Sequence, residues 1–399
     1  MSAFRTLDDI GEVGGKVALV RVDFNVPMDA GVVTDDTRLR AALPTVKALT
    51  EAGAKVALLA HFDRPKGKRV ATMSLRPVAE AFAKTLGKPV AFVEDCVGET
   101  AKAAVDAQPA GGVALLENVR FHPGEEANDP DFAKALSKVG DLFINDAFSA
   151  AHRAHASTAG LADHLPAFAG ANMAREISAL DAALGGDPER PVIGVVGGSK
   201  VSSKLDLLKN LVTKLDKLAI GGGMANTFLY AQGWEIAASY AEKDLAETAR
   251  EIIRLAGLNQ CKLFLPLDIV VAERLEPGAA ARTRAVGLID PEERIFDAGP
   301  ETIERLIRAM KNSKTLVWNG PLGVFETPPF DNGTVAAAKA AAKLCRKGKL
   351  NAVAGGGDTV AALNHAGVAQ DFTFVSTAGG AFLEWLEGKP LPGVEALRV

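Results

Sequence analysis

The sequence predicts an α/β protein of two doubly wound, Rossmann-like parallel-sheet domains joined by a helix. Short runs rich in Val, Ile, Leu and Ala alternate with helix-length amphipathic stretches through most of the chain. The runs are apolar at consecutive positions, which is typical of parallel strands covered by helices on both faces. The same alternation fills both halves of the 399 residues, a length that accommodates about two domains of ~150 residues each.

The first domain is expected over residues 1–170. Its strands are predicted over residues 16–22, 55–61, 89–95, 112–118 and 141–148. Residues 39–53 and 75–87 lie between strands and have the periodicity of amphipathic helices. Residues 171–186 have the same periodicity and end at Gly185 and Gly186, a common helix stop, so this helix is predicted to connect the domains.

The second domain is expected over residues 187–376 and repeats the pattern. Its strands are predicted over residues 191–198, 217–223, 261–271, 315–320, 350–357 and 372–377. In open α/β sheets, ligands bind beyond the carboxyl ends of the strands. The residues that follow each strand are therefore the candidates for function.

Charge and cysteine usage exclude several classes of partner. A formal net charge of −4 gives no positive field to hold the chain on nucleic acid or on an anionic membrane. The three cysteines are isolated, as is typical of a reducing compartment. The N-terminus has no apolar secretory segment, and no run approaches the ~18 apolar residues of a membrane helix. We therefore expect a soluble, cytoplasmic protein without nucleic-acid or membrane partners.

Cationic and polar residues follow the strands of the first domain, and together they predict a small-anion pocket. Arginine forks bind carboxylate or phosphate, while carboxylate and amide side chains orient hydroxyls. For one residue alone, a surface ion pair or a packed histidine is the simpler interpretation, and no zinc motif accompanies the histidines. The candidates are Arg21, Asp23, Asn25, His61, Arg64, Arg120, His122, His152 and Arg153.

Glycines follow the strands of the second domain instead and predict a nucleotide cleft. Glycine lets the backbone approach a ligand closely, and helix-opening N–H groups attract phosphates. Ordinary turns are the alternative, and the absence of G-x-G-x-x-G disfavours a dinucleotide. The glycines are Gly197, Gly198, Gly221, Gly222, Gly223, Gly320, Gly355, Gly356, Gly357, Gly379 and Gly380.

Several polar positions in the second domain carry specific hypotheses. Lys200 and Lys204 are four residues apart and are predicted to share the first turn of a helix, where bridging phosphates would offset their repulsion. Asp358, with Thr359 at a predicted helix start, is either an N-cap or a ligand of Mg²⁺ on nucleotide phosphates. Glu326 could accept hydrogen bonds from ribose hydroxyls.

Long motifs in one order resemble the phosphoglycerate kinase family over nearly the whole chain. They include RVDFNVP, HFDRPKGK, LLENVRF, NDAFSAAHRAHAS, GGSKVSSKL, IGGGMANTFL, WNGPLGVFE, AGGGDT and STAGGAFLEWLEGKPLPGV. The resemblance implies reversible phosphoryl transfer between 1,3-bisphosphoglycerate and ADP, giving 3-phosphoglycerate and ATP with Mg²⁺. It further implies a monomer with a hinge helix, in which the last residues, from about 377 to 399, pack back on the first domain.

By matching motifs, the resemblance assigns residues to roles. The catalytic residues would be Arg38, Lys200, Gly379 and Gly380, with Asp358 as the metal ligand. The substrate pocket would be Arg21, Asp23, Asn25, Arg38, His61, Arg64, Arg120, His152 and Arg153. The nucleotide would be held by Lys204, Gly222, Gly223, Asn319, Glu326, Gly355, Gly356, Gly357, Asp358 and Thr359.

The chain departs from the family's usual sequence at two positions, and the sequence leaves two alternative functions open. The family commonly has glycine where this chain has Asp63 and Ala378. We expect the Asp63 side chain to point away from the anion pocket, and Ala378 to need no positive φ. A non-catalytic two-lobed anion-binding protein would explain the arginines but not the glycines. An NAD-dependent dehydrogenase would require the missing dinucleotide motif.

Overall fold

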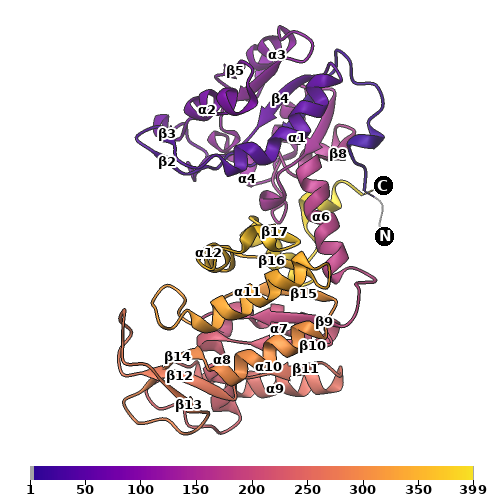
Figure 1. The fold of residues 1–399 in the computed structure, drawn as a ribbon. Helices are drawn as coiled ribbons and strands as arrows, with labels where there is room; N and C mark the ends of the chain where they lie inside the picture. The colour runs from indigo at the N-terminus through magenta and orange to yellow at the C-terminus, as the bar shows by residue number, and fades with distance from the viewer. Residues whose placement is uncertain (1–3, 399) are drawn as a thin grey trace. The chain divides into compact units, whose positions relative to one another are not determined.

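The computed structural model describes residues 4–398, which form two compact units (Figure 1). One unit holds the chain up to Ser178 together with the residues from Pro390 onward, and the other is Ala179–Lys389. The division falls inside helix α6, Ala171–Leu184, which is the expected connecting helix. The C-terminal return to the first unit begins at Pro390, later than the expected start near residue 377.

The first unit is built on a six-stranded parallel sheet with the order β5-β6-β4-β1-β7-β8. Its strands are β1 Val17–Arg21, β4 Lys55–Leu59, β5 Val90–Val93, β6 Val113–Leu116, β7 Leu142–Asn145 and β8 Ala167–Ala169. Five of these were predicted, but β8 was missed because three residues are too short for a recognisable pattern. A small hairpin, β2 Met28–Asp29 with β3 Val32–Val33, was missed for the same reason.

The core of the first unit lies between this sheet and its helices. Ala18 and Val20 of the central strand β1 belong to one apolar cluster with Leu39 and Val46 of α1 and Phe82 of α2. Alternate residues of the same strand face the other side, so the strand is buried throughout. The helices are α1 Thr37–Glu51, α2 Arg76–Leu86, α3 Gly98–Asp106, α4 Pro123–Glu126, α5 Pro130–Ser137 and α14 Pro392–Glu395.

The second unit has its own six-stranded parallel sheet with the order β11-β10-β9-β15-β16-β17. Its strands are β9 Val192–Val196, β10 Lys217–Ile220, β11 Lys262–Phe264, β15 Thr315–Asn319, β16 Asn351–Gly355 and β17 Phe374–Ser376. In chain order this is the 3-2-1-4-5-6 arrangement of nucleotide-binding folds. Both sheets therefore confirm the predicted fold class.

Helices cover both faces of the second sheet. On one face, Ile193 and Trp318 pack with Leu306 of α10 and with Ala338 and Ala342 of α11. The small alanine side chains let α11 lie close to the strands. The helices are α7 Leu205–Lys214, α8 Gly222–Ala231, α9 Ala246–Leu258, α10 Pro300–Lys311, α11 Asn332–Arg346, α12 Gly357–His365 and α13 Gly379–Leu386.

The predicted strand over residues 261–271 is wrong. It is two strands in different sheets: β11 ends at Phe264, and β12 is Asp268–Ala272. Pro266 lies between them and cannot donate to a ladder. β12 pairs antiparallel with β13, Arg282–Ala285, and β14, Arg294–Ala298, neither of which was predicted because polar residues interrupt their sequences.

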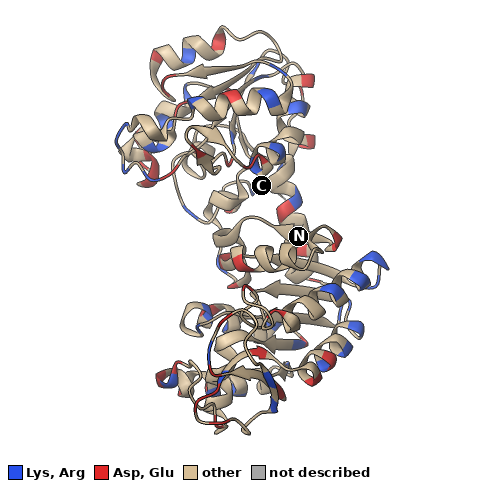
Figure 2. Cartoon of the chain, turned by 60° about the vertical axis from the view of Figure 1, so that its left-hand side comes forward, with Lys and Arg blue, Asp and Glu red and all other residues tan. Residues whose placement is uncertain are grey.

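Charges are spread over both units without a strongly basic face in view. Figure 2 shows Lys and Arg interspersed with Asp and Glu on both units, in keeping with the net charge of −4. Among the helices within residues 4–398, none combines the length and the apolar character needed to cross a membrane.

Candidate functional site

In the first unit, the predicted anion-binding residues gather where parallel strands end. Arg38, in the first turn of α1, donates from Nη1 to Asp23 Oδ1 at 3.0 Å and to the Asn25 carbonyl at 2.9 Å. Its side chain remains 35% exposed. The side-chain oxygen of Asn25 accepts from the amide of Asp63 at 3.0 Å, so Asn25 joins the segment after β1 to the segment after β4.

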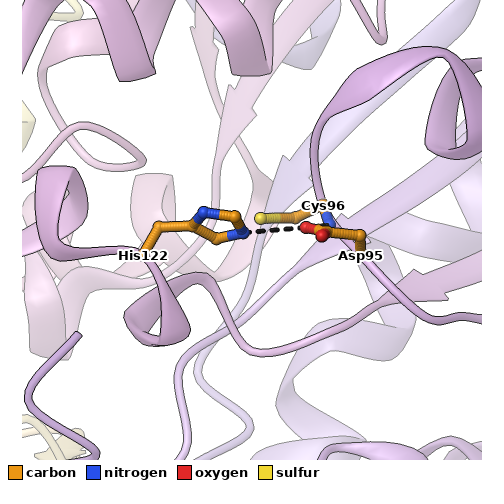
Figure 3. Close-up of side chains that lie close together, drawn as sticks. All are labelled: Asp95, Cys96 and His122. Atoms are coloured by element: carbon orange, nitrogen blue, oxygen red, sulfur yellow. Dashed lines mark hydrogen bonds and ion pairs between the residues drawn. The ribbon is translucent and has the colours of Figure 1, made fainter. Parts of the chain in front are cut away.

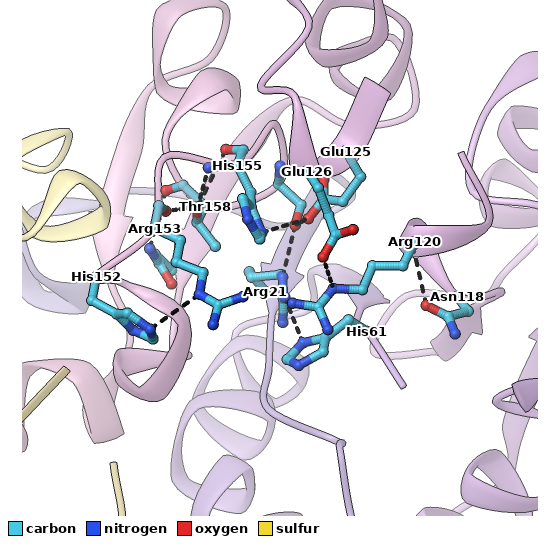
Figure 4. Close-up of polar contacts among 12 residues, drawn as sticks. Arg21, His61, Asn118, Arg120, Glu125, Glu126, His152, Arg153, His155 and Thr158 are labelled. Atoms are coloured by element: carbon cyan, nitrogen blue, oxygen red, sulfur yellow. Dashed lines mark hydrogen bonds and ion pairs between the residues drawn. The ribbon is translucent and has the colours of Figure 1, made fainter. Parts of the chain in front are cut away.

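Arg21 differs from the other arginines because it is completely buried. Figure 4 shows its side chain beside His61. Its Nε donates to Ser157 Oγ at 2.8 Å, its Nη1 to the Val22 carbonyl at 2.5 Å, and its Nη2 contacts His61 Nδ1 at 2.9 Å. Burial lowers the pKa of its guanidinium from the ordinary value. Each of the three nitrogens therefore has a protein partner, so Arg21 helps to hold the pocket together, while its predicted contact with a ligand stays a prediction.

The remaining cations lie around the same strand ends. Arg120, on the 3₁₀ turn Val119–Phe121, is mostly buried and donates to the Asp63 carbonyl at 2.8 Å. Arg64 and Arg153 are exposed, and Arg153 Nε donates to His152 Nε2 at 3.2 Å. The pocket thus combines anchored arginines with exposed ones that can bind an anion from solvent.

A second cluster, Asp95, Cys96 and His122, lies beyond the end of β5 (Figure 3). One possible metal-ligand atom from each lies within 4.8 Å of the others. His122 Nε2 is 2.8 Å from Asp95 Oδ1, which also accepts from the Cys96 amide at 2.7 Å. Burial raises the pKa of the Cys96 thiol well above its usual value. This arrangement satisfies the carboxylate without an ion and braces the segment that follows Arg120.

In the second unit, the predicted pairing of two lysines on one helix turn is wrong. Residues 202–204 form a 3₁₀ turn and α7 begins only at Leu205, so Lys200 lies in the loop before both of them. Its side chain is exposed. Lys204 points back to the strand ends, where Nζ donates to the Gly197 carbonyl and to Asn319 Oδ1, both at 2.6 Å. Burial lowers the pKa of its ammonium to about 8. The carbonyls, rather than a helical turn, determine where Lys204 lies.

Glycines bring the loops at these strand ends close together. Gly222 has φ +64, and a Cβ there would lie 2.6 Å from the Gly198 carbonyl oxygen. Gly356 has φ +98, with Asn319 Nδ2 at 2.7 Å from its ideal Cβ position. Any larger residue would separate these loops, so the glycines are required by close approach as well as by conformation.

Several predicted nucleotide ligands hold this cradle together. Thr359 Oγ1 accepts from the Gly320 amide at 2.7 Å, and Asn319 Nδ2 donates to the Gly355 carbonyl at 2.8 Å. These contacts join the ends of β15 and β16. Gly223 lies in the first turn of α8 and packs near Ser199, and a Cβ on Gly223 would be 3.0 Å from the Ser199 carbonyl oxygen.

Asp358, the candidate metal ligand, lies where its carboxylate could bind a metal ion. Asp358 is exposed in the first turn of α12, whose N-cap is Gly356, so the N-cap alternative for Asp358 is wrong. An exposed carboxylate beside helix-opening N–H groups suits Mg²⁺ held with phosphate oxygens. Glu326 is likewise exposed. Gly379 and Gly380 open α13 after Ala378, whose φ of −91 fits the expectation that it needs no positive φ.

Comparisons with known proteins agree over the full chain. The family model described as phosphoglycerate kinase matches residues 7–389. The chain belongs to the phosphoglycerate kinase family. It is 67% identical over 396 residues to a phosphoglycerate kinase of Caulobacter sp. (strain K31), covering 99% of this chain and 100% of that protein. A second relative from Sphingopyxis alaskensis is 60% identical over 398 residues, the whole of both chains.

Solved structures of phosphoglycerate kinases have the same fold. The structure from Coxiella burnetii is 41% identical with a TM-score of 0.92, and it covers 99% of both chains. The structure from Pyrococcus horikoshii OT3 is 31% identical with a TM-score of 0.81, covering 99% of this chain and 98% of the other. Membership of the phosphoglycerate kinase family makes the chain a phosphotransferase and disfavours the binding-protein and dehydrogenase alternatives.

The sequence did not reveal the acidic groups that support these phosphoglycerate kinase sites. Glu125 lies in PGEEAND, which has the composition of an exposed turn, yet it is fully buried and bonded to Ser157. Glu242 bonds Ser202 from forty residues away, and nothing in the local sequence indicates this. Only the fold brings such partners together.

Proposed function

We propose that the chain transfers a phosphoryl group reversibly between 1,3-bisphosphoglycerate and ADP, giving 3-phosphoglycerate and ATP. The observation that carries this proposal is the pairing, in one family member, of an arginine pocket in one unit with a glycine cradle in the other. The first suits a phosphorylated acid and the second a nucleotide phosphate chain.

The acid would bind in the first unit through residues at the strand ends. Arg64, Arg120, His152 and Arg153 would hold the distal phosphate, with Asn25 oriented toward the glycerate. Asp23 already fixes Arg38 and so controls where that guanidinium points. Guanidinium forks bind such oxygens in pairs, which fixes the orientation of the acid as well as its affinity.

The nucleotide would bind in the second unit, with Lys204, Gly222 and Gly223 near its phosphates and Glu326 near its ribose. Asp358 would hold Mg²⁺, which when bound neutralises charge on the phosphate oxygens. The run Gly355–Thr359 would present backbone N–H groups at the start of α12.

Transfer itself requires positioned positive charge more than covalent chemistry. In the transition state charge spreads over the equatorial oxygens of the moving phosphoryl group. Arg38 would stabilise it from the acid side and Lys200 from the nucleotide side, with backbone N–H groups of Gly379 and Gly380. We propose that movement about the hinge helix brings the two ligands in line and excludes water. The enzyme would act as a cytoplasmic monomer.

A coupled assay tests the function directly. ATP, Mg²⁺ and 3-phosphoglycerate are supplied to the purified chain, and the acyl phosphate formed is reduced by glyceraldehyde-3-phosphate dehydrogenase with oxidation of NADH. We expect turnover that depends on all three reagents. Folded protein that gives no NADH oxidation would refute the kinase function, and tight binding of NADH to the chain alone would favour a dehydrogenase.

A further inference from the structure

A chain of buried hydrogen bonds leads from a carboxylate with no assigned role to a histidine of the anion pocket. Glu125 of α4 is fully buried and accepts from the Ser157 amide at 2.9 Å and from Ser157 Oγ at 2.6 Å. Ser157 Oγ in turn lies 2.8 Å from Arg21 Nε, and Arg21 Nη2 lies 2.9 Å from His61 Nδ1. Figure 4 shows Glu125, Arg21 and His61 converging from separate segments.

Burial raises the pKa of Glu125, while the charge of Arg21 and the hydrogen bonds from Ser157 oppose that rise. With Glu125 ionised, the donors and acceptors in this chain have one consistent assignment. The Ser157 hydroxyl has a single proton, which it gives to the Glu125 carboxylate, so its oxygen is free to accept from Arg21. A guanidinium only donates, and therefore His61 Nδ1 must accept from Arg21 Nη2. The proton of a neutral His61 then has to be on Nε2.

His61 is also kept neutral by its surroundings. Burial, and after it the charges of Arg21, Arg120 and Arg38 and a smaller contribution from His155, hold its pKa well below the ordinary value. Within residues 4–398 the hydrogen bond found for the His61 ring is the one at Nδ1, and the residue keeps 9% of its surface exposed, so Nε2 is open to a partner from outside the protein. A donor so placed among cations calls for an oxygen acceptor from a ligand or water.

We propose that Glu125 is a positioning residue of the anion pocket. Through Ser157 and Arg21 it holds His61 as the neutral tautomer with its proton on Nε2, which donates a hydrogen bond to an oxygen of the bound acid. His61 thus contributes direction without adding charge, while the arginines supply the charge. The inference rests on the proposed function only for the identity of that acid.

Nitrogen-15 NMR on the free enzyme tests the tautomer without any substrate. The chain has six histidines, so the His61 signals are assigned by their loss in His61→Gln. Imidazole nitrogen shifts distinguish a protonated from an unprotonated nitrogen. We expect His61 to stay neutral with the proton on Nε2 from pH 5 to pH 8. A proton on Nδ1, or titration near the ordinary pKa of ~6.5, would overturn the proposal.

Two variants test the positioning role of Glu125. Glu125→Gln keeps the shape but removes the charge, and Ser157→Ala removes the bridging hydroxyl. In both, His61 should populate both tautomers, and the KM for 3-phosphoglycerate should rise by several-fold with a smaller change in kcat. Glu99→Gln, an exposed acid on α3, is the matched control. If Glu125→Gln fails to fold, Ser157→Ala decides, and an unchanged spectrum and KM there would refute the role.

Replacement of His61 itself tests the donor. His61→Gln places an amide N–H close to the position of Nε2, whereas His61→Asn places it near Nδ1. We expect His61→Ala and His61→Asn to raise the KM roughly tenfold or more, and His61→Gln to recover much of the loss. Equal effects of Gln and Asn would contradict the donor role. Because the tautomer is read without turnover, failure of the kinase assay and failure of this inference are separate outcomes.

Discussion

At the scale of single residues, the exposed Lys200 and the half-buried Arg38 should matter for rate more than for folding. Lys200 is exposed, Arg38 pairs with Asp23 and keeps 35% of its side chain exposed, and both would face developing charge in the transition state. We expect Lys200→Ala and Arg38→Ala each to lower kcat about 100-fold, equivalent to about 3 kcal/mol, with little change in the melting temperature. Coupled-assay kinetics and thermal denaturation measure both, and near-normal kcat would contradict these roles.

Asp63 is a residue whose backbone and charge can be tested separately. It is exposed and has φ +52, a left-handed conformation that favours glycine. Asp63→Gly should raise the free energy of unfolding by about 1 kcal/mol, because glycine adopts this conformation without strain. Denaturant titration checks this.

The control at this position is Asp63→Ala, which removes the charge but keeps the strain. If Asp63 only weakens anion binding through its charge, both variants should lower the KM for 3-phosphoglycerate alike, and only the glycine variant should be more stable. Greater stability in Asp63→Ala as well would show that charge repulsion, rather than backbone strain, is the cause.

At the scale of elements, the sequence predicted what local periodicity controls and missed what tertiary contacts control. The buried parallel strands were readable because each is a continuous apolar run, as in Val17–Arg21. The prediction that Lys200 and Lys204 share a helix turn was wrong because Lys204 donates to the Gly197 carbonyl and to Asn319 Oδ1, contacts that the local sequence does not encode. Strand β13 was not predicted because its residues are largely exposed, so its sequence shows no alternation of apolar and polar residues.

The segment that carries Lys200 is held by a contact from another element. Glu242, between α8 and α9, accepts from the Ser202 amide at 2.9 Å and from Ser202 Oγ at 2.5 Å. We expect Glu242→Gln to lower kcat roughly three- to tenfold. The substitution removes a charge-assisted hydrogen bond, worth about 1.5–3 kcal/mol, that holds the turn after Lys200 in place.

The matched control for Glu242 is Glu247→Gln, an exposed acid in the first turn of α9 that pairs with Arg250. Steady-state kinetics should show Glu247→Gln close to the wild type. Equal losses in the two variants would mean that general surface charge, and not the hold on Ser202, is responsible.

At the scale of the whole molecule, the C-terminal residues return to the first unit, and no local sequence pattern predicts this return. The Gly393 amide donates to the Ala151 carbonyl at 2.8 Å, and Asn145 Nδ2 donates to the Gly393 carbonyl at 3.1 Å. A Cβ on Gly393 would lie 2.9 Å from Ala151 Cα, so glycine is needed for this contact. The family resemblance indicated the return, and the contacts set its start at Pro390.

In each unit, a buried carboxyl whose pKa is raised to about 7 couples stability to pH. Burial raises the pKa of Asp146 in the first unit and of Asp297 in the second to about 7. Between the ordinary value near 3.8 and pH 7, the folded state keeps a proton that the unfolded chain releases. The stability that each group gives is therefore complete below pH ~4 and is lost as the pH rises through ~7.

Replacing each carboxyl by an amide should flatten the pH dependence of its own unit. Asp146→Asn keeps an oxygen for the amides of Asn172 and Met173, which start α6, and cannot ionise. We expect its unit to gain stability at pH 8 relative to pH 5, by about 3 kcal/mol at most, because the wild-type loss spans about two pH units between pH 5 and the pKa of about 7. Asp297→Asn should change the second unit in the same direction but by less, since both Asp297 oxygens accept backbone amides and an amide side chain keeps one oxygen. Scanning calorimetry at both pH values should resolve which part of the transition moves, with the exposed Asp163→Asn as control. If Asp146→Asn and Asp297→Asn shift the same single transition by the same amount, the two units unfold as one cooperative body. If neither variant changes the melting temperature at either pH, both carboxyls are already ionised in the folded protein without cost, which would contradict the prediction.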